Sequence, residues 1–131
     1  MGIQNKMRLY GSVLMFLAVI FGAFASHYLR SILTQASLSS FEVGVRYLVY
    51  HGLALLIISF IKFRSLKNKK RFFNFLFTGV ILFSGSIFTL SFKAFFLFPI
   101  GWLGALTPLG GTLLIAGWFL LILEFYNRKT N

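Results

Sequence analysis

The chain has 131 residues, of which 58% are hydrophobic and only 11% are charged, and 18 of them are phenylalanine. Soluble domains carry about one charged residue in four, so this composition excludes an ordinary soluble fold and indicates a small helical membrane protein. The net charge of +11 would suit nucleic acid, but the basic residues flank apolar runs, which indicates membrane orientation and no nucleic-acid binding.

The first predicted span covers residues 9–29, which contain no charged side chain and are long enough for about 30 Å of helix. Ala18, Gly22 and Ser26 form a ladder of small residues that favours close helix packing. A second interpretation stays open, because the basic start and the sequence Ala23-Phe24-Ala25 before Ser26 are also typical of a signal peptide with its cleavage site.

A polar stretch, residues 30–40, follows the first span and keeps apolar residues at helical spacing. This pattern predicts a short helix lying in the membrane interface. Ser39 and Glu42 have the spacing of a capping box, so the second span is predicted over 39–61.

Six cations fall within residues 62–71, which predicts a basic loop between the second and third spans. The third span is predicted over 72–92 and the fourth over 100–123, after a turn at Pro99. Pro108 falls inside the fourth span, where it predicts a kink or a locally unwound turn.

Together these segments predict an all-α membrane protein, a four-helix transmembrane bundle with a short interfacial helix between its first two spans. Ten of the 13 Lys and Arg residues fall on one predicted side of the bilayer, and Arg30, Arg46 and Lys93 fall on the other. Because Lys and Arg are retained on the cytoplasmic side, we expect a plasma-membrane protein with both termini in the cytoplasm.

Helical rise predicts that polar residues of three spans reach one level in the outer half of the bilayer. His51 is the ionisable member, and intramembrane ionisable residues are functional candidates. Two interpretations stay open: a small polar pocket centred on His51, or a structural bond from His51 to a serine or to a carbonyl freed by Pro108. The candidate pocket residues are His27, Tyr47, His51, Ser84, Ser86, Thr107 and Pro108. The candidate close-packing residues are Ala18, Gly22, Ser26, Gly85, Gly110 and Gly111.

Motifs for chemistry are absent from the sequence. The two carboxylates, Glu42 and Glu124, are expected at opposite membrane faces, which excludes paired acid–base work and carboxylate metal sites. Catalysis by Ser84 or Ser86 with His51 lacks an acidic residue to orient the histidine, and haem ligation by His27 and His51 is disfavoured by their unequal depths. We therefore expect no enzyme activity, no metal and no cofactor.

Four fragments, in order, resemble the membrane-protein family called domain of unknown function 423, or uncharacterised protein family 0382. They are Gly22-Ala23-Phe24-Ala25-Ser26-His27, Gly44-Val45-Arg46-Tyr47-Leu48-Val49-Tyr50-His51-Gly52-Leu53-Ala54-Leu55-Leu56, Phe83-Ser84-Gly85-Ser86, and Thr107-Pro108-Leu109-Gly110-Gly111 with Ala116-Gly117-Trp118. The family usually has other residues where Ala25, Ser26 and Phe88 stand. The resemblance implies a bacterial multi-pass membrane protein with no assigned activity.

The sequence therefore favours a non-enzymatic binding or accessory protein of the bilayer, whose polar cluster around His51 binds a small ligand, a lipid head or a partner helix. A homo-oligomer or a partner membrane protein is compatible with this function. The alternative is an oligomeric transporter or channel for a proton or small solute, with His51 and a helix broken at Pro108 lining its path.

Overall fold

Four long helices make up the computed structural model, which describes residues 1–129. They are α1 (Ile3–Phe24), α3 (Gln35–Ser59), α4 (Leu66–Ser91) and α5 (Leu106–Lys129). Each, with its adjoining helical turns, is long and apolar enough to cross a membrane. The prediction of an all-α protein with four spans is therefore confirmed.

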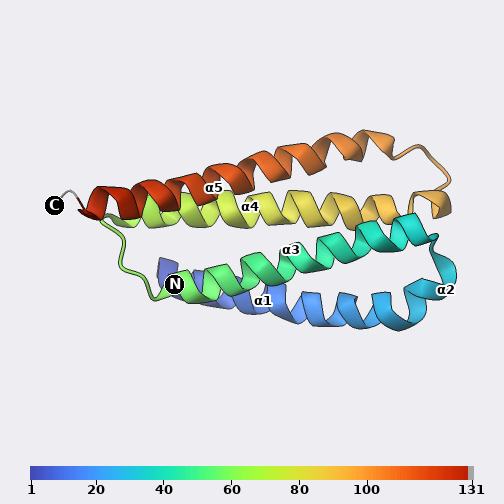
Figure 1. The fold of residues 1–131 in the computed structure, drawn as a ribbon, viewed down its shortest axis with the longest axis horizontal. Helices are drawn as coiled ribbons and strands as arrows, with labels where there is room; N and C mark the ends of the chain where they lie inside the picture. Colours follow the sequence, from blue (N-terminus) through green and yellow to red (C-terminus); the bar gives the residue numbers. More distant parts are fainter. Residues whose placement is uncertain (130–131) are drawn as a thin grey trace.

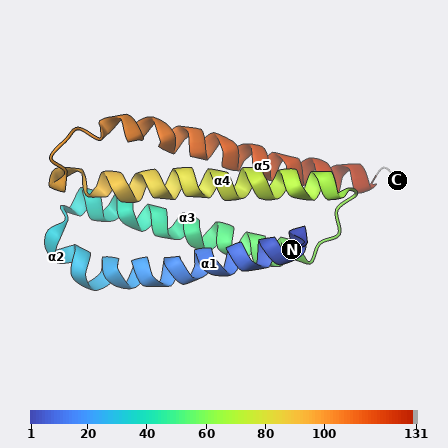
Figure 2. The same cartoon turned by 180° about the vertical axis from the view of Figure 1, so that it is seen from behind.

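The helices run antiparallel and lie side by side in the order α1, α3, α4, α5 (Figures 1 and 2). Both termini and the α3–α4 connection lie at one end, here called the terminal end. The α1–α3 and α4–α5 connections lie at the other, here called the loop end. The outer helices α1 and α5 each pack mainly against one neighbour, α1 against α3 and α5 against α4.

The α1–α3 connection differs from the prediction. Helix α1 runs on through a π-helical turn, Ala25–Leu29, and one further turn, α2 (Arg30–Ile32). The expected interfacial helix is present only as this single turn. Thr34 then adopts an extended conformation, and its hydroxyl accepts a hydrogen bond from the Ser37 backbone N–H at 3.2 Å. The prediction that Ser39 caps the second span is wrong, because Thr34 does so and α3 begins at Gln35.

The α3–α4 connection is shorter than predicted. Ser65 is extended and its hydroxyl accepts from the Asn68 backbone N–H at 3.1 Å, which starts α4 at Leu66. Most of the basic segment 62–71 therefore belongs to the first turns of a helix, where Lys67, Lys70 and Arg71 are exposed and Lys69 is buried.

The α4–α5 connection contains two 3₁₀ turns, Lys93–Phe95 and Gly101–Ala105, and the second leads directly into α5. Pro108 lies in the first turn of α5, where a missing backbone N–H costs no helical hydrogen bond. The kink expected inside the fourth span is therefore absent, and the change of helix type falls at Leu106 instead.

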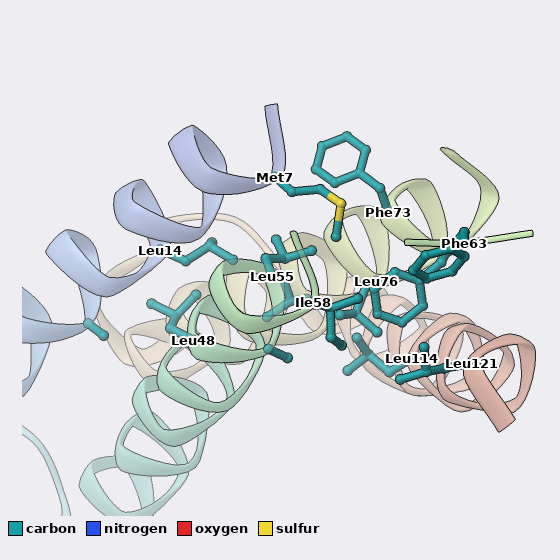
Figure 3. Packing of buried hydrophobic residues seen from close by; sticks show 14 residues of the cluster. Met7, Leu14, Leu48, Leu55, Ile58, Phe63, Phe73, Leu76, Leu114 and Leu121 are labelled. Atoms are coloured by element: carbon teal, nitrogen blue, oxygen red, sulfur yellow. The ribbon is translucent and has the colours of Figure 1, made fainter. Parts of the chain in front are cut away.

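A continuous apolar core fills the space between the helices (Figure 3). Met7, Leu55, Leu76 and Val80 are fully buried within it, and a smaller cluster around Phe41 lies at the loop end. The core draws residues from all four helices, so no helix is stable in its place alone.

Glycines allow two of the helix contacts to be close. A Cβ on Gly11 would lie 2.9 Å from the Gly52 carbonyl, which brings α1 against α3. A Cβ on Gly110 would lie 2.5 Å from the Phe83 backbone nitrogen, which brings α5 against α4. Helix association in lipid depends on such small residues.

The other predicted close-packing residues differ from one another. Ala18 is buried, and a Cβ on Gly22 or Gly111 would make ordinary contacts at 3.6 and 3.8 Å. Ser26 is exposed and bonds the Gly22 carbonyl. Gly85 is a correction: its side of α4 faces open space, with nothing within 4 Å of an added Cβ.

Candidate functional site

An apolar groove of about 600 Å³ runs along one face of the row of helices, between α3 and α5 with α4 as its floor. Tyr47 of α3 stacks on Phe83 of α4, with ring centroids 4.2 Å apart, and closes its loop end. We call this the α3–α5 groove. Its lining residues are Tyr47, Tyr50, His51, Phe83, Gly111, Leu114, Ile115, Trp118, Phe119 and Ile122.

His51 is buried at the side of this groove and uses both ring nitrogens. Nδ1 lies 2.8 Å from the Tyr47 carbonyl oxygen, one turn back in α3. The Trp118 indole N–H of α5 donates to Nε2 at 3.2 Å. An indole N–H can only donate and a carbonyl can only accept, so Nε2 is the acceptor and Nδ1 carries the proton. This arrangement fixes a neutral imidazole in one tautomer.

The hydrogen bonds of His51 have a structural consequence. The bond from Trp118 joins α5 to α3, and the bond to Tyr47 fixes the ring within α3. A protonated ring would set a second N–H donor against the indole N–H. The structural interpretation expected His51 to bond a serine or a carbonyl freed by Pro108. Its partner on another helix is instead Trp118.

The predicted polar pocket does not form as one cavity. Ser84 of α4 donates to the Gly44 carbonyl of α3 at 2.9 Å. Ser86 of α4 and Thr107 of α5 are hydrogen-bonded at 2.7 Å. Pro108 is exposed beside Thr107. Ser84 and the Ser86–Thr107 pair face separate helix contacts. His51 lies at another level, because its partner Trp118 is eleven residues after Thr107 in α5, roughly 16 Å along the helix. The prediction that these polar residues share one level is therefore wrong.

His27 lies apart from the other candidates. It is exposed in the π-helical turn that follows α1, beside Phe24 and Tyr28. Of the seven candidate residues, Tyr47 and His51 line the α3–α5 groove. Trp118 and Phe83 also line it and were missed as site residues, although an indole N–H deep in a span needs an acceptor.

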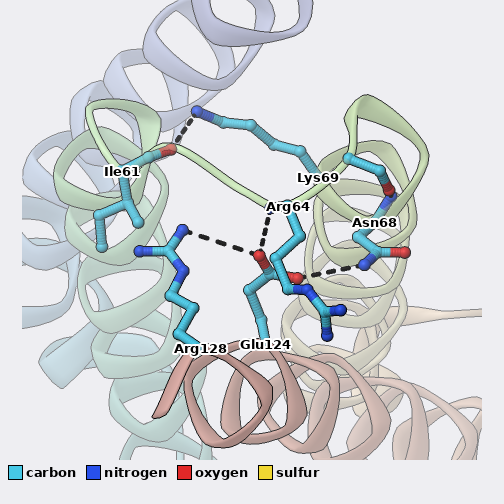
Figure 4. Close-up of polar contacts among 7 residues, drawn as sticks. Ile61, Arg64, Asn68, Lys69, Glu124 and Arg128 are labelled. Atoms are coloured by element: carbon cyan, nitrogen blue, oxygen red, sulfur yellow. Dashed lines mark hydrogen bonds and ion pairs between the residues drawn. The ribbon is translucent and has the colours of Figure 1, made fainter. Parts of the chain in front are cut away.

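A second polar site lies at the terminal end, where Glu124 of α5 is 3% exposed (Figure 4). Its carboxylate accepts from the Arg64 backbone N–H and from the Asn68 side-chain amide at 3.1 Å. Arg128, one turn on, forms an ion pair with it at 3.7 Å. Glu124 therefore holds the α3–α4 connection and the start of α4 against α5.

Lys69 belongs to the same group of polar contacts (Figure 4). We call this group the polar junction; its residues are Arg8, Ser59, Ile61, Arg64, Asn68, Lys69, Glu124 and Arg128. Its side chain is turned inward, and Nζ donates to the Ser59 and Ile61 carbonyls at 2.7 Å each. These carbonyls lie at the end of α3, where a helix leaves acceptors unpaired and favours a cation. Arg8 of α1 bonds the Ser59 hydroxyl at 3.3 Å. The polar junction therefore ties all four helices together.

The two carboxylates lie at opposite ends of the described structure, as the sequence indicates. Glu42 is in α3 toward the loop end and Glu124 is in α5 toward the terminal end. Across residues 1–129, no three His, Cys, Asp or Glu side chains gather in a group that could hold a metal ion.

Comparison with known proteins gives the family. A family model described as "Protein of unknown function (DUF423)" matches residues 21–111. The chain belongs to the DUF423 family. It is 40% identical over 116 residues to the UPF0382 membrane protein SH2409 of Staphylococcus haemolyticus, covering 88% of this chain and 91% of the relative.

Two further relatives carry the same description. The UPF0382 membrane protein of Haemophilus influenzae is 35% identical over 115 residues, which is 88% of this chain and 89% of the relative. The UPF0382 membrane protein YwdK of Bacillus subtilis is 34% identical over 114 residues, which is 86% of this chain and 89% of the relative. No solved structure matches the chain significantly. The resemblance to the family is confirmed: the chain is a multi-pass membrane protein of an uncharacterised family.

Proposed function

We propose that this DUF423 member is a non-enzymatic binding protein of the bilayer, which holds an apolar ligand in the α3–α5 groove. One observation carries the proposal: a groove of about 600 Å³ is lined almost entirely by aromatic and aliphatic side chains. Binding sites of this size combine apolar walls with few polar groups. The groove opens on the side of apolar helices, where the surrounding medium is lipid.

The polar groups near the groove support binding over catalysis. Both His51 nitrogens are engaged within the protein, so no free base faces the groove. The Ser84 and Ser86 hydroxyls are bonded to Gly44 and Thr107 at helix contacts. A nucleophile needs a base within hydrogen-bond reach, and neither serine has one.

The distribution of charge supports a plasma-membrane protein with its terminal end in the cytoplasm. The polar junction and the exposed cations of the first turns of α4 lie at that end, whereas Arg30 and Lys93 lie at the loop end. Lys and Arg are retained on the cytoplasmic side of a membrane. The loop end then faces outward, and the α3–α5 groove begins in the outer half of the bilayer.

Transport receives less support than binding. Discontinuous helices provide the ion and solute sites of many transporters, but α5 runs from Leu106 to Lys129 without a break. His51 could relay a proton only after its bond to Trp118 opens. Measurable proton or solute flux in liposomes that His51→Ala abolishes would favour transport over binding.

The experiment that tests binding is native mass spectrometry of the protein extracted in mild detergent. Gly111→Leu fills the groove, and a Cβ at this position has room because its nearest neighbour lies 3.8 Å away. Gly85→Leu is the matched control, since Gly85 faces open space away from the groove. We expect a bound non-protein mass on the wild type and on Gly85→Leu but not on Gly111→Leu.

Two results of that experiment would contradict the proposed binding site. A wild-type chain that carries no bound mass, or a Gly111→Leu variant that keeps it, would refute the groove as the binding site. A bound polypeptide in place of a small molecule would show an accessory role toward a partner helix.

A further inference from the structure

We infer that the ligand of the α3–α5 groove is a phospholipid, whose phosphate binds Arg46 and whose acyl chain lies in the groove. This inference rests on the proposed function and names its ligand class. Its evidence begins with Arg46, whose side chain belongs neither to the core nor to the polar junction.

Arg46 belongs to the exposed face of α3. The exposed residues that follow it at helical spacing are all apolar or aromatic: Tyr50, Leu53, Ile57 and Phe60. Within residues 1–129, the Arg46 side chain has no hydrogen-bond or ion-pair partner. Arg46 is thus a cation at the start of a row of apolar residues that faces lipid. Its charge requires a partner from outside the protein.

The depth of Arg46 makes this requirement stronger. It lies eleven residues after Gln35, the first residue of α3, or roughly 16 Å along the helix. Charged side chains at such depths are costly and mark functional positions. Helical side chains lean toward the N-terminus of their helix, so the Arg46 guanidinium points toward the loop end.

Arg46 lies next to the loop end of the groove, on the exposed side of α3. Tyr47, the next residue, and Tyr50, one turn on, both line the groove, which continues from them toward the terminal end. In the arrangement that we infer, the acyl chain lies along Leu114, Trp118 and Ile122, and the phosphate lies beyond Tyr47 on the lipid-facing side of α3, next to Arg46. Guanidinium groups bind phosphates with paired, charge-assisted hydrogen bonds.

The charge next to Arg46 specifies the headgroup. Glu42 lies one turn nearer the loop end on the same face of α3 and is half-buried. A second negative headgroup would be repelled there, whereas an ammonium group beyond the phosphate would be attracted. The headgroup of phosphatidylethanolamine has a phosphate followed by an ammonium group, so it matches Arg46 followed by Glu42.

The test is a lipid titration followed by native mass spectrometry in detergent, with phosphatidylethanolamine, phosphatidylglycerol and diacylglycerol as probes. We expect phosphatidylethanolamine to bind the wild type more tightly than either other lipid. Arg46→Gln should bind it about tenfold more weakly, because a charge-assisted hydrogen bond is lost. Arg30→Gln, at an exposed site in α2, is the control and should bind like the wild type.

Two more variants separate a binding role from a structural one. Arg46→Lys keeps the charge and should bind more tightly than Arg46→Gln. Glu42→Gln should reduce the preference for phosphatidylethanolamine over phosphatidylglycerol. Circular dichroism of each variant shows whether the fold is kept, and Arg46→Lys remains informative if Arg46→Gln does not fold.

The failure of this inference differs from the failure of the proposed function. If Arg46→Gln binds phosphatidylethanolamine as the wild type does, or diacylglycerol binds equally well, the headgroup site is refuted and an apolar groove remains. If none of the three lipids binds the wild type, or Gly111→Leu binds as tightly as the wild type, the groove itself is refuted.

Discussion

Trp118 of α5 donates its indole N–H to Nε2 of His51 in α3, across 3.2 Å and 67 positions of sequence. The two helices are not neighbours in the row, because α4 lies between them. This bond links the two walls of the α3–α5 groove directly, in addition to the packing of each wall against α4.

The first prediction concerns the tautomer of His51. The Trp118 donor and the Tyr47 acceptor require a neutral ring with its proton on Nδ1. Nitrogen NMR of histidine-labelled protein in micelles at pH 7 should show one resonance pair of this tautomer. The other histidine, His27, is exposed in the π-helical turn after α1 and is removed from the spectrum by His27→Ala. A His51 signal of the Nε2-protonated tautomer would contradict the hydrogen bond to Trp118.

The second prediction tests the strength of this bond. Trp118→Phe keeps an aromatic ring but removes the donor, so Nε2 of His51 loses its partner. The free energy of unfolding should fall by about 1–2 kcal/mol, the range for a hydrogen bond between membrane helices with some lost packing. Thermal unfolding in detergent measures the change. Trp102→Phe is the control, because Trp102 is 69% exposed, and equal effects of the two substitutions would argue against the bond.

The third prediction compares two glycines of adjacent helices. Alanine at Gly110 places its Cβ 2.5 Å from the Phe83 backbone nitrogen, which forces α5 away from α4. Overpacking of this kind costs about 1–3 kcal/mol of unfolding free energy. Gly85→Ala meets open space and should be neutral or stabilising by up to about 1 kcal/mol. Unfolding in detergent should rank the variants in this order, and a stable Gly110→Ala would show that the helices are not held as close.

The sequence predicts the helices of this fold better than their ends. Long uncharged runs require four spans, and those four helices are present. The start of α3 was predicted wrongly because Thr34 and Ser39 are both hydroxyl residues that precede a helical pattern. Either could cap the helix, and the spacing of Ser39 and Glu42 favoured the wrong one. The choice between them depends on the π-helical turn at Ala25–Leu29, which sets where the chain leaves α1. No local pattern in the sequence indicates such a turn.

The depth of the site was not predicted correctly, and neither was its direction. Trp118, the partner of His51, lies eleven residues after Thr107 in α5, roughly 16 Å along the helix, so His51 and Thr107 are not level. His51, Ser84 and Thr107 also face different helix contacts. Rotation of each helix about its axis is fixed by packing, for example by Gly110 against Phe83, and not by its own apolar pattern. A role for Glu124 could have been predicted, since it is the one carboxylate on the predicted side of the membrane that has ten of the 13 Lys and Arg residues.

The last prediction concerns the Glu124 carboxylate, which joins the α3–α4 connection to α5. Glu124→Gln keeps one acceptor oxygen but replaces the other with an amide donor, so it cannot satisfy Arg64, Asn68 and Arg128 together. The loss leaves buried polar groups without partners, at a cost of about 1–3 kcal/mol. It should also release residues 60–65 from α5, and trypsin should then cleave after Arg64 faster than in the wild type.

Glu42→Gln provides the matched control for this experiment, because Glu42 lies in α3 toward the loop end, far from the connection that is cleaved. Its cleavage rate after Arg64 should equal that of the wild type. Cleavage that is equally slow in Glu124→Gln would show that the Arg64 backbone is held by other contacts. Cleavage that is faster in both variants would indicate a general loss of stability, and unfolding curves of the same samples separate these results. A local effect at Glu124 alone identifies this carboxylate as the group that fastens one helical hairpin to the other at the terminal end.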